Sequence, residues 1–347
     1  MSAPTAGDRS VTRPGTKDAE AGRTRRGRQC AARESRRALL EGCGAPRYTD
    51  HGGPASERRW GRGQAVESTV GRRERHRRMI AAVVAEMAVG TVVSHQSAAV
   101  LYGTTLWHVP LERVCVTRNR RGGGRIRPFA KIHGSPVDSV VELDGLLVTT
   151  PARTVVDLAL ALPFEAAVVA GDALVGAFGL TADQLAEELA RAKGRYGINQ
   201  AKEVLAVLDG RSRSIGESLS RTMIHRHGLP LPSSQGNVLT PDGRFVTRVD
   251  FYYESAGLLC AFDGPTEYGR LLRPGQDPAA LAHRERARET YLRTLGFEII
   301  RWTWDDLVRG TPARRLRTAL TTHRRPPDGR IEPAPIPAPR QLPIRTL

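Results

Sequence analysis

Residues 248–264 read RVDFYYESAGLLCAFDG, and this stretch decides the fold that we expect for the second half of the chain. The runs 244–253 and 258–263 are rich in apolar, β-branched and aromatic residues, which is typical of strands. Between them, 254–257 contains serine and glycine and is typical of a turn. The stretch therefore predicts a β-hairpin whose second strand is of the buried, central kind.

The register of this hairpin brings carboxylates together. If the turn is a symmetric four-residue loop, Asp250 faces Ala261, and Arg248 faces Asp263. Residues i and i+2 share a sheet face, so Asp250, Ala261 and Asp263 lie on one face, with opposed side chains ~5 Å apart. Asp250 and Asp263 are the candidate metal ligands, because carboxylate oxygens bind Mg²⁺ or Mn²⁺. Such an ion activates water for phosphodiester hydrolysis.

Outward from the hairpin, the second half predicts the order helix, strand, strand, strand, helix, strand. The expected elements are a helix over 214–226, strands over 237–240, 244–253 and 258–263, a helix over 278–295, a strand over 297–303 and a short helix over 305–309. Ser214 and Glu217 have capping-box spacing, so Glu217 either only caps the first helix or also serves the carboxylate site.

The first half mixes helices and strands as well. We expect helices over 97–102, 151–162, 165–176 and 181–192, strands over 113–117 and 130–133, and a glycine-rich basic loop over 120–127. The stretches 194–199 and 209–214 are typical of a linker. The expected fold class is α/β (mixed α+β), with two small domains at 76–205 and 211–310.

Charge is concentrated at the ends of the chain. The net charge is +17 over 347 residues, and 1–80 and 310–347 carry nearly all of it. We expect 1–75 to be a disordered basic region and 311–347 to be an extended Pro/Arg-rich tail. The four cysteines have no metal-ligand spacing, and there is no apolar stretch typical of a signal peptide or a membrane span. The expectation is a cytoplasmic protein without a membrane partner.

The second half resembles a known group of proteins. The segments SIGESLSR (214–221), RVDFYY (248–253), AFDGPTEYGRLL (261–272) and LGFEIIRWTWDDL (295–307) resemble the endonuclease-like domain related to very-short-patch-repair nucleases. That domain belongs to the restriction-endonuclease-like superfamily and is common in actinobacterial proteins. The resemblance implies an αβββαβ core, with catalytic carboxylates at Glu217, Asp250 and Asp263.

This chain departs from the pattern of that group at one position. Ala261 stands where the resemblance implies a glutamate opposite Asp250, and Pro265 and Glu267 stand in a loop that often carries lysines. Either the site is vestigial and needs no cofactor, or another carboxylate such as Glu267 substitutes and Mg²⁺ or Mn²⁺ is used. We favour an inactive site.

The first half resembles a second family. The segments SHQSAAVLYG (94–103), VCVTRNR (114–120) and LLVTTPARTVVDLALALP (146–163) resemble the body of AbiEi-like antitoxins of type IV toxin–antitoxin systems, which regulate transcription. The DNA-reading winged helix-turn-helix of such proteins is not recognisable in 1–75. Either that module is absent, or 1–75 does not contain the true start of the protein.

For two further features of the first half, a functional and a purely structural interpretation are compared. The arginines of the basic loop either contact nucleic-acid phosphates or form a solvated surface; they are Arg120, Arg121, Arg125 and Arg127. His95 stands beside Ser94, but no carboxylate is near in the sequence, so a catalytic triad is not expected.

Together these features predict a DNA-associated regulator or antitoxin-like protein with a degenerate, inactive nuclease-like domain. One alternative is an active metal-dependent DNA endonuclease in repair or phage defence. Another is a scaffold that binds a toxin. DNA and a cognate toxin are the partners that the two resemblances imply.

Overall fold

The computed structural model describes residues 69–120, 123–264, 278–322 and 326–347. The chain divides into two compact units, Met1–Val89 and Gly90–Leu347. In the first unit, the helix α2 spans Thr69–Ala85. Most of the region expected to be disordered, 1–68, lies outside the described residues, but 69–75 is helical, so the expected boundary at 75 is corrected to 68 at the latest.

The first half of Gly90–Leu347 is built on a seven-stranded sheet in the order β12-β5-β6-β1-β2-β4-β3. Its strands are β1 (Val92–Val93), β2 (Val114–Arg118), β3 (Arg125–Ile126), β4 (Ala130–Gly134), β5 (Ser139–Leu143), β6 (Leu146–Thr149) and β12 (Ile344–Thr346). The strands β5 and β6 were not expected. They are joined by Asp144 and Gly145, both with positive φ, which is the geometry that a two-residue hairpin turn requires.

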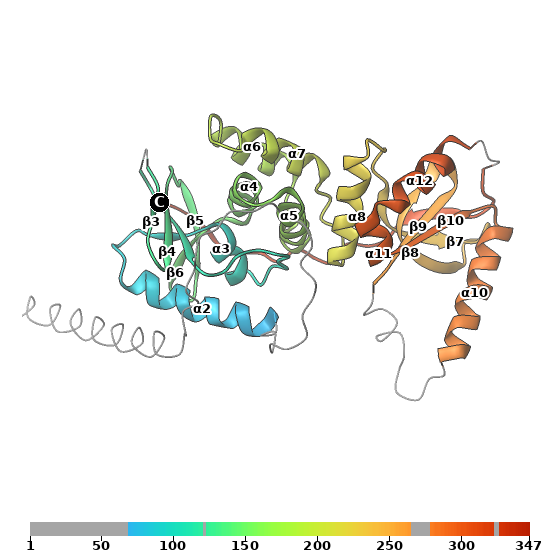
Figure 1. Ribbon diagram of the computed structural model, residues 1–347, viewed down its shortest axis with the longest axis horizontal. Coiled ribbons are helices and arrows are strands. Elements are labelled where there is room, and N and C mark those ends of the chain that lie inside the picture. Colours follow the sequence, from blue (N-terminus) through green and yellow to red (C-terminus); the bar gives the residue numbers. More distant parts are fainter. Residues whose placement is uncertain (1–68, 121–122, 265–277, 323–325) are drawn as a thin grey trace, which may run out of the picture. The chain divides into compact units, whose positions relative to one another are not determined.

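Five helices accompany this sheet. They are α3 (His95–Leu101), α4 (Pro151–Ala161), α5 (Phe164–Phe178), α6 (Ala182–Arg191) and α7 (Ile198–Val207). The helix α4 begins as expected, because the Thr150 side chain accepts a hydrogen bond from the Arg153 backbone N–H and Pro151 occupies the first turn. It packs against α3, α5, α6 and α7 and forms the centre of this half (Figure 1).

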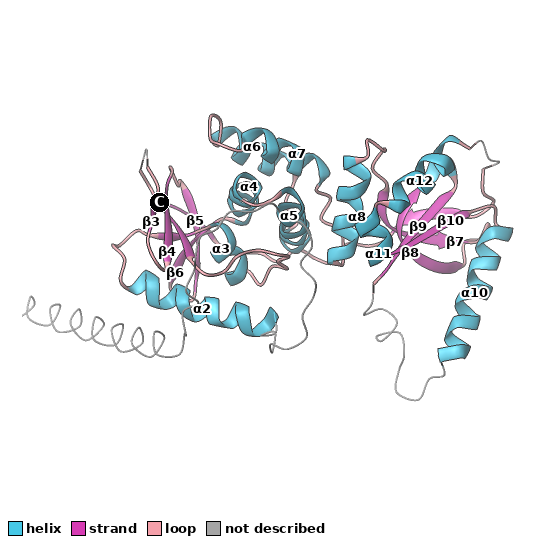
Figure 2. Ribbon diagram, in the orientation of Figure 1, coloured by secondary structure: helices cyan, strands magenta, loops and turns pink. Residues whose placement is uncertain are grey.

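The second half is built on a five-stranded sheet in the order β10-β9-β8-β7-β11 (Figure 2). Its strands are β7 (Ser233–Leu239), β8 (Phe245–Tyr253), β9 (Leu258–Asp263), β10 (Glu298–Thr303) and β11 (Arg330–Pro333). The strand β10 runs parallel to β9, and the other neighbours are antiparallel. The helical elements are α8 (Ile215–Arg226), the short 3-10 helix η1 (Glu254–Ala256), α10 (Pro278–Thr294), α11 (Trp304–Arg309) and α12 (Thr311–Thr321).

Helices cover both faces of the second sheet. On one face, Ile224 of α8 and Leu316 of α12 pack with Phe251, Leu258 and Trp302 of the strands. On the other face, the core contains Leu259 of β9 together with Leu292 of α10. The order α8-β7-β8-β9-α10-β10 is the predicted αβββαβ core, and the mixed α/β fold class is confirmed.

The helix α7 lies between the two stretches that are typical of a linker, and it overlaps the first of them only at 198–199. Both stretches lie within the compact unit Gly90–Leu347. Asp172 of α5 accepts a hydrogen bond from Ser218 of α8 at 2.7 Å, so buried polar contacts join the two halves.

Part of the expected tail forms regular structure, and the expectation of an extended chain is corrected at 311–321, which is helical. Residues 311–321 form α12, β11 pairs with β7, and β12 pairs with β5 in the first sheet. None of the described helices is long and apolar enough to cross a membrane.

Candidate functional site

The β8–β9 hairpin has the predicted register. Phe251 pairs with Cys260, and the pairing continues to the turn. Continuing the same register away from the turn places Asp250 opposite Ala261. There the Asp250 carboxylate accepts a hydrogen bond from the Phe262 backbone N–H at 2.9 Å. The sequence therefore located Asp250 correctly, but one of its carboxylate oxygens binds the neighbouring strand.

Asp263 is engaged by an arginine. Arg301 donates from Nε to Asp263 Oδ2 at 3.0 Å and from its terminal nitrogen to Oδ1 at 2.5 Å. This two-point ion pair arises because β10 runs parallel to β9 and places Arg301 beside Ala261. Arg248 pairs with Asn237 of β7, on the other side of β8. The sequence pattern did not assign this role to Arg301, because it depends on strand order between distant segments.

Glu217 is hydrogen-bonded at the start of α8 and lies near the charge of Asp250. Ser214 Oγ accepts from the Glu217 backbone N–H at 3.1 Å, which caps α8, and Glu217 Oε2 accepts from the Arg213 backbone N–H at 2.9 Å. The side chain is also buried, at 3% exposed. Burial and the nearby charge of Asp250 raise the pKa of Glu217 to about 7. Glu217 and Asp250 are therefore electrostatically linked.

Gln235 belongs to this site, and the sequence analysis missed it. Its neighbours Ser234 and Gly236 pair with Phe251 and Val249, so Gln235 lies opposite Asp250 on the adjacent strand. Gln235 Nε2 donates to Glu217 Oε2 at 2.8 Å. The residue has a positive φ of 60°, which a side chain other than glycine rarely adopts. No sequence pattern marks a glutamine for this conformation.

Among the described residues, the candidate metal ligands are already engaged by other groups of the protein. Asp263 pairs with Arg301, one oxygen of Asp250 accepts the Phe262 N–H, and Ala261 has no ligand atom. Within the described ranges, no group of three or more His, Cys, Asp or Glu side chains is placed to hold a metal. Pro265 and Glu267 lie outside the described residues.

A pocket of about 350 Å³ lies over this part of the sheet, between the strands and α10. Its charged lining is mixed, consisting of Arg248, Asp250, Asp263, Glu285, Arg288, Glu289 and Arg301. Glu289 also lies 3.5 Å from Arg301, so the guanidinium is shared by two carboxylates. Charged side chains that line the pocket are thus paired with one another.

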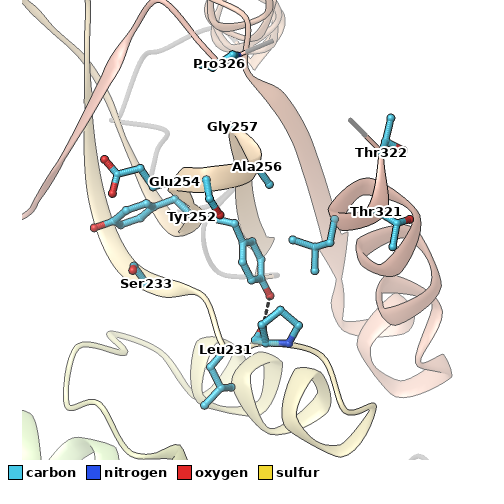
Figure 3. A pocket seen from close by; sticks show the side chains of 13 residues that line it. Leu231, Ser233, Tyr252, Glu254, Ala256, Gly257, Thr321, Thr322 and Pro326 are labelled. Carbon is cyan, nitrogen blue, oxygen red and sulfur yellow. Dashed lines mark hydrogen bonds between the residues drawn. The ribbon is translucent and has the colours of Figure 1, made fainter. Parts of the chain in front are cut away.

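Figure 3 shows a larger pocket, of about 880 Å³, whose lining does not include Glu217, Asp250 or Asp263. Tyr253 donates its hydroxyl to the Pro230 carbonyl at 2.8 Å, and the hydroxyls of Thr321 and Thr322 bond to carbonyls of their own helix. Glu254 is the lining carboxylate. This pocket contributes no set of reactive side chains.

The basic loop of the first half is partly described. Arg120, Arg125 and Arg127 are exposed, and Arg125 belongs to β3, at the edge of the seven-stranded sheet. Arg120 donates to the Gly123 carbonyl at 3.1 Å. Arg121 lies outside the described residues. The three described arginines are accessible, as the phosphate-contact interpretation requires.

A carboxylate does lie near His95, which corrects the sequence interpretation. Ser94 Oγ is 2.9 Å and Asp157 Oδ2 is 3.9 Å from His95 Nδ1. Both partners approach the same ring nitrogen, whereas a catalytic triad uses the two nitrogens separately. All three residues are buried. Asp157 also binds the Arg153 and Arg195 side chains at 3.1 and 3.0 Å, so the cluster is a structural polar network.

The fold and site define a mixed α/β protein in which Arg301 forms an ion pair with Asp263 at the candidate site. No family model matches the chain, and no solved structure is significantly similar. Two proteins of Mycobacterium tuberculosis match: MT2308 of strain CDC 1551 and Rv2248 of strain H37Rv. Each is 30% identical over 203 residues, which is 58% of this chain and 71% of the relative. The chain belongs to the family of these uncharacterized mycobacterial proteins.

Proposed function

We propose that the protein is a DNA-associated, antitoxin-like regulator whose nuclease-like domain does not hydrolyse DNA. The observation that carries the proposal is the two-point pairing of Asp263 with Arg301, next to Ala261. A guanidinium supplies a fixed positive charge, but it does not lower the pKa of a bound water as a metal ion does. Among the described residues of the site, the charge beside Asp263 is therefore one that does not generate a hydroxide nucleophile.

The carboxylates of the site also accept hydrogen bonds from the protein itself. One oxygen of Asp250 accepts the Phe262 N–H, and one oxygen of Glu217 accepts two N–H groups. A metal ion at Asp263 would have to displace Arg301, which loses a charge-assisted pair that is partly buried. These interactions stabilise the hairpin and the start of α8 instead of a hydrolytic centre.

The proposed DNA contacts involve arginines that are accessible. Arg120, Arg125 and Arg127 are exposed beside the edge of the first sheet, and α2 carries five arginines within 72–78. Guanidinium groups bind phosphates, and such binding weakens steeply with salt. The toxin partner is proposed from the resemblance of 94–163 to antitoxins.

Incubation of plasmid DNA with the protein and Mg²⁺ or Mn²⁺ tests whether the site is inactive in hydrolysis. We expect no nicking by the wild type. Ala261→Glu combined with Arg301→Gln supplies the missing carboxylate and releases Asp263, so this double variant is expected to bind Mn²⁺ more tightly. Adding Asp250→Asn to it should abolish that gain. Robust cleavage by the wild type that is lost in Asp250→Asn would contradict the proposal.

DNA association is tested separately, by fluorescence anisotropy with labelled duplex. The full chain is expected to bind with a steep salt dependence, and a chain beginning at residue 90 is expected to bind more weakly because it lacks the basic residues of 1–89, including those of α2. Binding that is absent for the full chain at low salt would contradict the DNA part of the proposal, whatever the cleavage result.

An active endonuclease is the second candidate, and one observation favours it. The charge of Asp250 raises the pKa of Glu217, so the two carboxylates are close enough for a cation to relieve their repulsion. In that case, cleavage should require Glu217, Asp250 and a third carboxylate such as Glu267. Loss of Mn²⁺-dependent nicking in both Glu217→Gln and Glu267→Gln would support this candidate.

A further inference from the structure

A third cavity, apart from Asp250 and Asp263, lies where α5, the segment 210–213 and the segment 334–340 meet. Its volume is about 330 Å³, which is within the usual range for small-molecule sites. Its side chains with polar or charged groups are those of Asp172, Arg211, Ser212, Arg213, Gln235 and Arg340. Three cations against one carboxylate give the cavity a positive charge.

The three arginines of the cavity are not neutralised by protein carboxylates. Among the described residues, none of them forms an ion pair. Arg211 donates to the Ala334 carbonyl at 3.3 Å, and Arg340 donates to the Tyr102 carbonyl at 3.0 Å. Carbonyl contacts orient a guanidinium and leave its positive charge uncompensated.

Arg213 lies near a second positively charged side chain, that of Arg248. Its side chain is exposed at the cavity, and its charge is one of the causes that lower the pKa of Arg248, after burial. Like charges held together are unfavourable unless an anion lies between or beside them. Protein chains tolerate such an arrangement at sites that bind phosphate groups.

Two neutral side chains of the cavity also carry a buried polar atom that forms no hydrogen bond. Gln235 is 4% exposed, and its Oε1 has no hydrogen-bond partner, as is also true of Ser212 Oγ. A buried polar atom without a partner costs free energy, so it points to a ligand or an ordered water. The backbone of Gln235 has a positive φ and is therefore strained, and proteins retain such strain mostly at functional positions.

The cavity wall is rigid because two backbones meet there. A Cβ atom on Gly176 would lie 2.3 Å from the Gly210 carbonyl oxygen, and Gly210 has a φ of +66°. Only glycine fits at both positions. This close approach fixes Arg211 and Ser212, the next two residues, relative to α5, which is the preorganisation that a binding site needs.

We propose that this cavity binds a small phosphorylated molecule that also carries a hydroxyl or N–H group, such as a nucleoside monophosphate or a sugar phosphate. The phosphate binds Arg211, Arg213 and Arg340. The hydroxyl or N–H group donates to Gln235 Oε1. Because Gln235 also binds Glu217, an occupant of the cavity contacts the network at the start of α8.

Isothermal titration calorimetry of the full chain tests the proposal with three probes: adenosine 5′-monophosphate, inorganic phosphate and a short DNA duplex. Adenosine 5′-monophosphate is expected to bind more tightly than phosphate. Arg213→Gln should weaken both by about tenfold, because a charge-assisted hydrogen bond is lost. The matched control is Arg284→Gln, an exposed arginine of α10 outside the cavity, which should leave both affinities unchanged.

Gln235→Asn separates the two parts of the site. Asparagine tolerates positive φ, and its shorter side chain withdraws the amide oxygen. We expect weaker binding of the nucleotide and unchanged binding of phosphate. The proposal is overturned if neither small probe binds saturably at millimolar concentrations, or if Arg213→Gln and Arg284→Gln behave alike. It is equally overturned if Arg213→Gln weakens only duplex binding, since the arginines would then serve DNA phosphates.

Discussion

His95 is a buried histidine whose titration is coupled to folding. It is 2% exposed, lies 2.9 Å from Ser94 Oγ and stacks on His133 with ring centroids 3.8 Å apart. Burial lowers the pKa of His95 from 6.5 to about 4, although the negative charge of Asp157 acts in the opposite direction. Folding therefore favours the neutral imidazole.

The sign and size of the pH effect follow from this shift. Because the pKa is lower in the folded state, the unfolded chain binds more protons, and stability is lost as pH falls from 6.5 towards 4. When the pH falls from 7.5 to 5, the preference of the folded state for neutral His95 should lower the free energy of unfolding by about 2 kcal/mol. His95→Asn removes this loss, and asparagine accepts the positive φ of 53° at this position.

Urea unfolding of the wild type and His95→Asn at pH 7.5 and pH 5 measures the difference. The free energy of unfolding should fall by about 2 kcal/mol more in the wild type than in the variant. His283→Asn, at an exposed position of α10, is the control and should follow the wild type. An identical loss in the wild type and His95→Asn would refute the conclusion that His95 is held neutral.

Three further predictions concern the second half. Asp250→Asn should move the pKa of Glu217 from about 7 towards its usual 4.5, as followed by carboxyl carbon chemical shifts in NMR; an unchanged titration would show that burial alone raises it. Gly216→Ala should destabilise the protein by about 2 kcal/mol or more in thermal unfolding, because the added Cβ would lie 1.9 Å from the buried Phe262 ring. Removal of residues 323–347 should lower the melting temperature, since it deletes β11 and β12; an unaltered melting temperature would mean that these strands contribute no stability.

The sequence predicts local structure well where the signals are local. Thr150 and Pro151 marked the start of α4, and the turn at 254–257 set the β8–β9 register, which placed Asp250 opposite Ala261. Capping by Ser214 was likewise readable from its spacing to Glu217. In each case the residues that determine the geometry lie within a few positions of one another.

Other features depend on contacts between distant segments. The pairing of Arg301 with Asp263 requires β10 to lie beside β9, and 38 residues separate the two side chains along the chain. The strained Gln235 is fixed by its neighbours on other elements. The helix α7 was missed because Gly194 and Gly197 precede it and resemble linker glycines, although Gly197 adopts the positive φ of its N-cap. The Asp144–Gly145 turn was a local signal that the sequence analysis overlooked.

The strands β11 and β12 have a consequence for biosynthesis. The strand β12 pairs with β5, and the side chains of Arg345 and Glu142 that accompany this pairing are 203 residues apart. Until 344–346 have been synthesised, the edge of β5 has unpaired backbone groups, and the edge of β7 stays open until β11 is made. Open strand edges pair readily with other chains, so nascent chains crowded on one messenger RNA are exposed to aggregation for most of their synthesis. Contacts of such long sequence separation also form slowly, which makes this protein a strong candidate for chaperone dependence during expression.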